Sequence, residues 1–277
     1  MSELAKNCIR GVLRTIRKRS DTNLFWWKGP PYNAGDWTGP YLYKAITNNE
    51  PTYKESSNRS LSTVFFTVGS LTRWICEDSI IWGSGLLDRD EVFWRPYETV
   101  AVRGPYTRDR FHELGYPCPS LYGDPAILLP RYLKIPCQQI RHKIGIIPHY
   151  SNIQEVSKNF GQNDDFHIVD IRWPLEKVIQ AILTCHYVIS SSLHGLIFSH
   201  SYGIPAARVE FMTKVGGDGV KFDDYYAAGG VYNKLAPLVI TGKIGSVELE
   251  QYVESSPQPD LEPLIEPLLK SCPFMKN

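Results

Sequence analysis

The sequence predicts an α/β fold built on parallel sheets. Short apolar runs, rich in β-branched and aromatic residues, alternate along the chain with stretches of helical periodicity. Strands that are apolar on both faces are typical of parallel sheets covered by helices. We expect strands within 22–29, 62–70, 78–87, 98–104, 143–150, 166–172, 187–192 and 205–211. Helices are expected at about 39–47, 105–115, 174–185 and 194–203.

A polar and basic stretch at 128–143 separates two groups of strands. Pro130 and Pro136 bracket most of it, and a new strand begins at Lys143. A chain of 277 residues is long enough for two domains. We therefore predict two Rossmann-like domains, residues 1–135 and 136–277, that face each other across a cleft. Ligands of such sheets bind beyond the carboxyl ends of the strands, so the loops there are expected to carry the chemistry.

The composition argues against several classes of protein. A net charge of +1 at pH 7 does not fit binding to nucleic acid through bulk electrostatics. The six cysteines are scattered and form no CxxC pair, which predicts neither a disulfide framework nor a zinc site. No apolar run reaches the roughly 18 residues of a membrane span, and the N-terminus has no apolar signal core. We expect a cytoplasmic protein without a bound metal.

The segment 5–19 is strongly basic and contains no acidic residue. Its apolar residues fall at helical spacing, so it is expected to form an amphipathic helix. Two interpretations stay open: a solvated helix docked on the body of the protein, or a helix lying on an anionic membrane surface at the inner face. The basic residues are Lys6, Arg10, Arg14, Arg17, Lys18 and Arg19, and the apolar ones Ile9, Val12, Leu13 and Ile16.

The loops after the expected strands are small, hydroxylated or cationic. One strand ends in three serines, and a helix begins directly after them. The free amide N–H groups at a helix start favour a bound anion. This bias indicates a pocket for a small anion with several charges. The residues concerned are Arg103, His149, Arg172, Ser190, Ser191, Ser192, Leu193 and His194.

Seven stretches, spread in order over nearly the whole chain, resemble the polysaccharide pyruvyl transferases. They are NAGDWTGPYL (33–42), WGSGLL (82–87), VRGPYTRDRFHELG (102–115), YGDPAILLP (122–130), IGIIPHY (144–150), ISSSLHGLIFSHSYGIP (189–205) and KFDDYY (221–226). The resemblance implies a fold like that of the two-domain GT-B glycosyltransferases. It also implies transfer of the pyruvyl group of phosphoenolpyruvate to a sugar, commonly as a cyclic ketal.

The resemblance implies a donor, an acceptor and no metal or other cofactor. Phosphoenolpyruvate is the expected co-substrate, and the acceptor is a sugar of a cell-surface polysaccharide precursor, free or on a lipid carrier. One departure concerns donor binding. Many relatives have Ser-x-Arg-Leu-His-Gly where this chain has Ser190 to Gly195, with Ser192 in place of the arginine. Either another cation neutralises the donor, or the site differs from that of these relatives.

Site roles follow from the chemistry of the reaction. A general acid must protonate the methylene carbon of the donor, and a base must take the proton of the sugar hydroxyl. His149 and His194 are the candidates, because the usual pKa of histidine lies near neutral pH, and the sequence does not decide which is which. We expect the serines 190–192, Leu193, Arg103, Arg172 and Lys221 to bind the donor.

The acceptor is expected to meet carboxylates and aromatic rings. Asp36, Trp37 and Trp82 are the candidates, whereas Trp26 and Trp27 are assigned to the core of a strand. Other acids are expected elsewhere: Asp124 to cap a turn, and Asp223 and Asp224 to form either a sugar or base site or a solvated loop.

Two rival functions are weighed against this one. A glycosyltransferase or sialyltransferase-like enzyme using a nucleotide-activated sugar would need an acid at a strand end in the second half, and no clear one is present. A carbohydrate-binding or scaffold protein would explain the aromatic residues but not the serine, histidine and arginine set.

Overall fold

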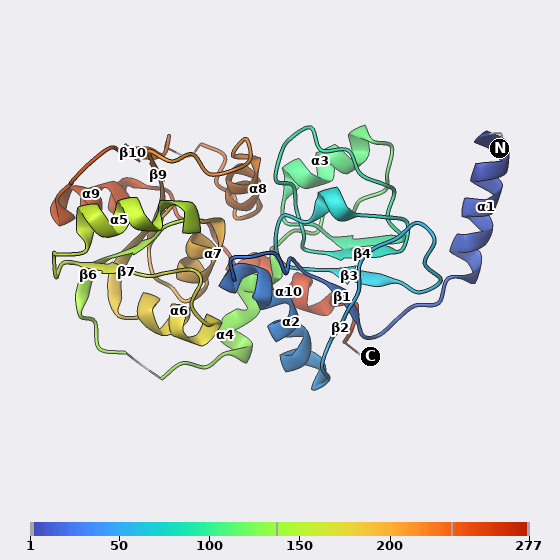
Figure 1. Ribbon diagram of the computed structural model, residues 1–277, viewed down its shortest axis with the longest axis horizontal. Helices are drawn as coiled ribbons and strands as arrows, with labels where there is room; N and C mark the ends of the chain where they lie inside the picture. Colours follow the sequence, from blue (N-terminus) through green and yellow to red (C-terminus); the bar gives the residue numbers. More distant parts are fainter. Residues whose placement is uncertain (1–2, 137, 234, 276–277) are drawn as a thin grey trace.

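The computed structural model describes residues 3–136, 138–233 and 235–275 and has two five-stranded parallel sheets (Figure 1). The first sheet has the order β2-β1-β3-β4-β5, with all its pairings parallel. Its strands are β1 (Asn23–Phe25), β2 (Thr52–Tyr53), β3 (Val64–Phe66), β4 (Ser79–Trp82) and β5 (Glu98–Ala101). The central strands β3 and β4 are buried along their whole length, as expected for a parallel sheet with both faces covered.

The second sheet has the order β10-β9-β8-β6-β7 and is also parallel. Its strands are β6 (His142–Ile147), β7 (Phe166–Ile168), β8 (Cys185–Ser190), β9 (Ala206–Phe211) and β10 (Leu238–Ile240). The predicted α/β class is therefore confirmed, and each expected strand is present. The edge strands β2 and β10 are additional. With only two residues, β2 is too short for the apolar pattern to reveal it.

Helices and short 3-10 turns connect the strands. The four helices expected between the strands are present as α2 (Ala34–Thr47), α3 (Pro105–Glu113), α6 (Leu175–Ile182) and α7 (Leu193–Ser201), and the helix expected within 5–19 corresponds to α1 (Glu3–Ile16). Helix α2 begins earlier than expected because the Asn33 side chain accepts a hydrogen bond from the Gly35 amide and caps the helix. The other elements are η1 (Thr72–Trp74), η2 (Pro125–Leu128), α4 (Leu129–Tyr132), η3 (Tyr150–Asn152), α5 (Ile153–Phe160), α8 (Val220–Ala228), α9 (Ser246–Ser255) and α10 (Glu262–Lys270).

The C-terminal segment returns to the first sheet, and α10 lies close to that sheet (Figure 1). The indole N–H of Trp82 on β4 donates to the carbonyl of Leu268 on α10 at 3.1 Å. The ring of Phe274 packs against those of Tyr43, Phe65 and Trp82. The division at residues 135 and 136 stays a prediction, and α10 packs with the half of the chain that this division assigns to the other domain.

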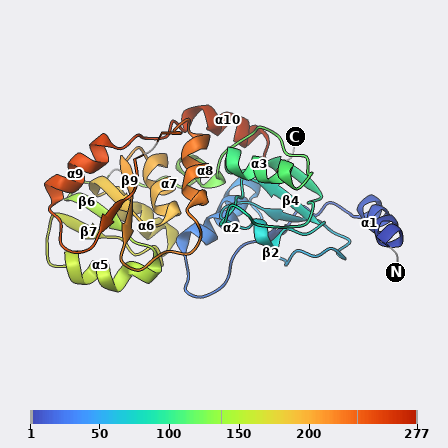
Figure 2. The ribbon, with the colours of Figure 1, turned by 90° about the horizontal axis from the view of Figure 1, so that it is seen from above.

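Helix α1 projects from the body of the protein (Figure 2). Its apolar side chains Ile9, Val12 and Ile16 are 48%, 56% and 54% exposed. Arg17, just after the helix, is buried and donates to the carbonyls of Ser60 and Glu77. This arginine therefore anchors the end of the segment rather than facing solvent. No helix among the described residues is long and apolar enough to cross a membrane.

Candidate active site

A cavity of about 180 Å³ lies where loops at the carboxyl ends of the two sheets meet, and we call it the inter-sheet cavity. The first sheet contributes loops after β1, β3 and β4 together with α2, and the second contributes loops after β6 and β8 together with α8. Its lining residues are Trp27, Pro30, Pro31, Asn33, Asp36, Ser70, Leu71, Trp74, Leu87, His149, Tyr150, Ser192, Leu193, His194 and Lys221. The cavity therefore lies where parallel sheets generally bind ligands.

The three serines after β8 have different roles. Ser190 is fully buried, and its hydroxyl donates to the Ile147 carbonyl at 2.7 Å and accepts from the Ser192 amide at 3.0 Å. These bonds fix the turn from β8 into α7. Ser192 lines the cavity as the N-cap residue of α7, and its hydroxyl makes no capping hydrogen bond. The cavity thus receives the positive end of a nine-residue helix together with a hydroxyl.

His194, in the first turn of α7, lies between the two sheets and is 7% exposed. Its Nε2 is 3.9 Å from Oδ2 of Asp124, and neither of these buried atoms has a hydrogen-bond partner. Burial and the positive charges of Arg103 and Lys221 lower the pKa of His194 to about 3. Burial raises the pKa of Asp124 to about 6. The imidazole is therefore neutral at pH 7.

Asp124 has the capping role that the sequence predicts for it. Its Oδ1 accepts a hydrogen bond from the Ala126 amide at 3.0 Å and caps η2. Its contact with His194 depends on bringing η2 against α7, and the spacing in the sequence does not reveal this.

Asp36 enters the cavity from the first turn of α2. Burial raises the pKa of its carboxyl group from 3.8 to about 7, and the positive charge of Lys221 only partly opposes this. A carboxyl group with a pKa near neutral exists in both protonation states at pH 7, as a general acid or base requires. The sequence places Asp36 among the acceptor residues, and the structure places it in the same cavity as His194.

Lys221 is the single lysine or arginine among the residues that line the inter-sheet cavity. It lies in the first turn of α8, is 9% exposed, and its Nζ donates to the Gly216 carbonyl at 3.3 Å. Burial, followed by repulsion from Arg103 and Arg208, lowers the pKa of Lys221 to about 8. An amine held out of water beside a cavity provides a strong attraction for an anion that enters it.

His149 lines the cavity on the side of β6. Its amide donates to the Ser191 hydroxyl at 2.9 Å, and its ring Nδ1 is 2.7 Å from the Ser151 hydroxyl. Ser191 therefore holds the His149 loop in position. Burial and Lys221 lower the pKa of His149 to about 4. Like His194, it is a neutral imidazole at pH 7.

Two arginines expected to contact the donor do not line the cavity. Arg103 is fully buried, and its Nε and Nη1 donate to Asp224 Oδ2 at 3.1 Å and to the Ser70 hydroxyl at 2.9 Å. It supports the cavity wall through Ser70, because Asp224 and backbone oxygen occupy its other donors. Arg172 is exposed, paired with Asp170 at 2.6 Å, and not among the residues that line the inter-sheet cavity. The expected direct contact with the donor is therefore corrected for both arginines, since neither of them lines the cavity.

The tryptophans are distributed differently from expectation. Trp82 is fully buried, so its ring cannot stack on a sugar, and the expected acceptor contact is wrong. Trp37 is half-buried, stacked on Tyr32 at 5.6 Å, and not among the lining residues. Trp26 is in the core as expected, but Trp27 is 43% exposed and lines the cavity. In an extended segment neighbouring side chains point in opposite directions, which explains this difference.

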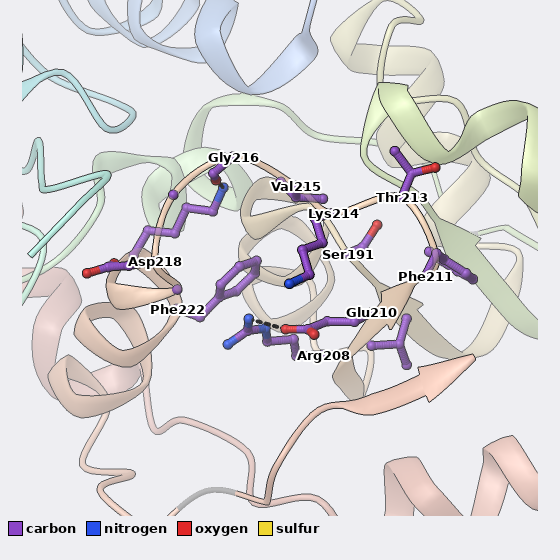
Figure 3. Close-up of a pocket in the computed structure, with 14 residues that line it drawn as sticks. Ser191, Arg208, Glu210, Phe211, Thr213, Lys214, Val215, Gly216, Asp218 and Phe222 are labelled. Atoms are coloured by element: carbon purple, nitrogen blue, oxygen red, sulfur yellow. Dashed lines mark hydrogen bonds and ion pairs between the residues drawn. The ribbon is translucent and has the colours of Figure 1, made fainter. Parts of the chain in front are cut away.

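A second cavity of about 210 Å³ lies beyond the end of β9 and shares Lys221 with the first. Figure 3 shows Ser191, Arg208, Glu210 and Lys214 around it, with Arg208 and Glu210 paired at 2.6 Å.

Asp224, for which the sequence left open a sugar or base site or a solvated loop, is buried and accepts hydrogen bonds from Arg103 and Thr107. Among the described residues, no three His, Cys, Asp or Glu side chains gather as a metal site.

The parallel α/β fold and the cavity with titratable and cationic groups are typical of an enzyme for a small charged substrate. The family model of the polysaccharide pyruvyl transferases matches residues 11–210, and the chain belongs to this family. An uncharacterized protein of Acanthamoeba polyphaga mimivirus is 29% identical over 217 residues, which cover 75% of this chain and 76% of that protein. The crystal structure of a functionally uncharacterized protein of Klebsiella pneumoniae matches 87% of this chain and 100% of its own, with a TM-score of 0.46 and 13% identity.

Proposed function

We propose that the protein transfers the pyruvyl group of phosphoenolpyruvate to a sugar of a cell-surface polysaccharide precursor and forms a cyclic ketal. The observation that supports this most directly is the inter-sheet cavity of this chain, which belongs to the pyruvyl transferase family. Lys221 and the start of α7 meet Asp36 and two neutral histidines there. The donor carries a phosphate and a carboxylate, and such charges need compensating groups when they leave water.

The proposed reaction balances without a further reactant. One sugar hydroxyl adds to C2 of the donor while the methylene carbon C3 gains a proton and becomes a methyl group. The C2–O bond to phosphate then breaks, and a second hydroxyl of the same sugar adds to C2. Of the two hydroxyl protons, one is matched by the proton at C3 and the other leaves with inorganic phosphate.

The titration behaviour of the cavity supports a division of roles. Asp36, with a pKa of about 7, is protonated in a large fraction of molecules, and a bound anion would raise that fraction by charge repulsion. We assign it the protonation of C3, a role that replaces its expected part in acceptor binding. His149 and His194 are neutral and serve as base candidates. Which of them faces the attacking hydroxyl stays open.

The arginine missing from the serine motif needs a substitute, and we assign this role to Lys221. Ser192 stands at the motif position and lines the same cavity as Lys221. Ser192, Leu193 and the amide groups of α7 complete the donor site, while Ser190 and Ser191 hold its loops. No metal or other cofactor is needed in this proposal.

The arrangement of the two sheets supports a GT-B-like reading in which the second sheet binds the donor and the first the acceptor. The cavity takes Asp36 and Trp27 from the first half and Ser192, His194 and Lys221 from the second. Trp37, stacked on Tyr32 beside Asp36, is then part of the acceptor side rather than the donor side.

We further propose that α1 rests on the inner face of the membrane, where a lipid-linked acceptor would lie. Its exposed Ile9, Val12 and Ile16 support this, together with the exposed Lys6 and Lys18. The protein should co-sediment with vesicles that contain one third anionic lipid. The Val12→Asp variant should no longer co-sediment with them. Unchanged sedimentation of that variant would exclude the helix as the contact.

Thermal unfolding in the presence of candidate donors tests the proposed reaction. A ligand that binds the native state raises the apparent Tm by mass action. We expect phosphoenolpyruvate to stabilise the protein, whereas UDP-sugars and CMP-sialic acid should not. The pyruvylated sugar is then identified by mass spectrometry together with released phosphate. Stabilisation by the nucleotides alone would favour a glycosyltransferase and contradict the proposal.

A further inference from the structure

A large groove lined by tryptophans lies beside the inter-sheet cavity, at the carboxyl end of the first sheet. Its volume is about 500 Å³, compared with about 180 Å³ for the inter-sheet cavity. It is formed by the loops after β1 and β2, by η1, and by Trp94. We call it the tryptophan groove, and its lining residues are Phe25, Trp27, Lys28, Gly29, Tyr53, Glu55, Ser56, Arg73, Trp74, Ile75, Cys76 and Trp94.

The groove and the inter-sheet cavity share two lining residues. Trp27 and Trp74 line both spaces, and their ring centroids are 5.2 Å apart at an interplanar angle of 32°. A ligand that extends from the cavity over these two rings therefore enters the groove. Trp94 also lines the groove; it is 44% exposed, and the Arg10 guanidinium lies 4.8 Å from the centroid of its ring.

Exposed indole rings with charged neighbours are suited to carbohydrate. An indole presents a flat apolar face, and the C–H face of a sugar ring is also flat and apolar, so that contact buries apolar surface on both. Sugar hydroxyl groups at the edge of the ring need donors and acceptors, and the groove offers the Glu55 carboxylate and the Arg73 guanidinium. Arg73 is held over Trp74 at 5.6 Å by its ion pairs with Asp88 and Glu91.

We propose that the tryptophan groove binds the sugar units that adjoin the pyruvylated residue, so that the enzyme prefers an oligosaccharide over a single sugar. This inference rests on the proposed function, because the pyruvylated residue itself must occupy the inter-sheet cavity. Two neighbouring rings and a third in the same groove suit a chain of linked sugars. The groove is therefore an acceptor subsite that sets specificity for glycan length.

The first test measures glycan binding without catalysis. Saturation-transfer NMR and tryptophan fluorescence are recorded with cellotetraose, β-1,4-galactotetraose, chitotetraose and mannotetraose, and with the corresponding monosaccharides. We expect saturable binding of at least one tetrasaccharide and weaker binding of its monosaccharide. Trp94→Ala should weaken the tetrasaccharide by about tenfold, the size expected for loss of one stacked ring. Absence of saturable binding by all four tetrasaccharides would overturn the inference.

Two further variants separate the groove from a general effect on folding. Tyr232→Ala removes another exposed aromatic ring, 68% accessible and outside both spaces, and should leave binding unchanged. Gly29→Ala keeps Trp27 but moves it, because a Cβ at Gly29 would lie 2.3 Å from Cζ2 of the Trp27 ring. It should weaken tetrasaccharide binding while far-UV circular dichroism stays unchanged. Equal effects of Trp94→Ala and Tyr232→Ala would contradict the assignment.

The second test separates this inference from the proposed function. With phosphoenolpyruvate and the bound tetrasaccharide as substrates, Trp94→Ala should raise KM for the tetrasaccharide and leave KM for phosphoenolpyruvate unchanged. If the tetrasaccharide binds but phosphoenolpyruvate does not, the proposed function fails and the groove stands. If phosphoenolpyruvate binds and no tetrasaccharide does, the groove assignment fails alone. If the wild type proves to be a dimer and Trp94→Ala a monomer with unchanged glycan binding, the groove is a contact between two copies of the chain and the inference is overturned.

Discussion

The imidazole of His194 packs directly against the backbone of Gly35, so that the start of α7 and the start of α2 touch at the inter-sheet cavity. A Cβ atom at Gly35 would lie 2.0 Å from Nδ1 of His194 and 2.3 Å from its Cγ. No side chain fits there unless the ring moves. This contact holds His194 between the two sheets, close to Asp124 on one side and to the cavity on the other.

Gly35→Ala should therefore displace the His194 ring. We expect a loss of stability of about 1–3 kcal/mol, as for an overpacked core, and a larger relative loss of kcat. Urea unfolding and a phosphate-release assay measure the two effects. Gly11→Ala is the matched control, because a Cβ there meets nothing within 4 Å. A fully active Gly35→Ala enzyme would show that the position of His194 does not matter for the reaction.

Asp36→Asn should abolish proton donation and preserve the shape of the cavity. The amide resembles the protonated carboxyl group, so we expect kcat to fall by about 10²–10⁴-fold with little change in KM for phosphoenolpyruvate. In the wild type, kcat/KM should decline as pH rises through about 7, where Asp36 loses its proton. If Asp36→Asn is as active as the wild type, the acid is a different group.

Lys221→Met should remove the cation that replaces the motif arginine. We expect phosphoenolpyruvate to lose its stabilising effect in thermal unfolding, because an unpaired anion in the cavity costs several kcal/mol. The second variant, Ser192→Arg in the Lys221→Met background, introduces the arginine that many relatives have at this position. It should recover part of the donor binding. Normal stabilisation of Lys221→Met by phosphoenolpyruvate would exclude Lys221 as the substitute.

His194→Asn should change the dependence of stability on pH. The native pKa of His194, about 3, is below its unfolded value of 6.5, so the unfolded chain binds more protons between these values and wild-type stability falls as pH falls. The His194→Asn variant does not lose this stability as the pH falls, because asparagine does not titrate. Relative to wild type, it should gain about 2 kcal/mol between pH 7.5 and pH 5.

Denaturant unfolding at the two pH values measures this difference. His186→Asn, at an exposed histidine, is the matched control for the substitution itself. An unchanged gap between His194→Asn and wild type would mean that the ring already carries a proton in the native protein.

Asp224→Asn should destabilise the protein by about 3–5 kcal/mol, because it leaves the buried Arg103 charge without its carboxylate. Asp223→Asn, at the adjacent and partly exposed residue paired with Arg89, should cost less than about 1 kcal/mol. Thermal or denaturant unfolding measures both. Equal stability of the two variants would contradict the structural role of the Arg103 and Asp224 pair.

The sequence by itself determined the class of fold, most strand positions, and which loops carry small, hydroxylated and cationic residues. These depend on local patterns: apolar runs, caps such as Asn33 and Asp124, and serines at the end of β8. Membership in the pyruvyl transferase family was also visible as ordered motifs, and the match over residues 11–210 confirms it.

Only the tertiary structure decided which of these residues share one cavity. Arg103 and Trp82 lie at strand ends in the sequence but are fully buried, while Trp27, in an apolar run, is exposed. The pKa of Asp36 and that of Lys221 depend on burial between segments far apart in the chain, and no local pattern reports such burial. Desolvation and contact arise from packing, and packing brings together residues that the sequence keeps apart.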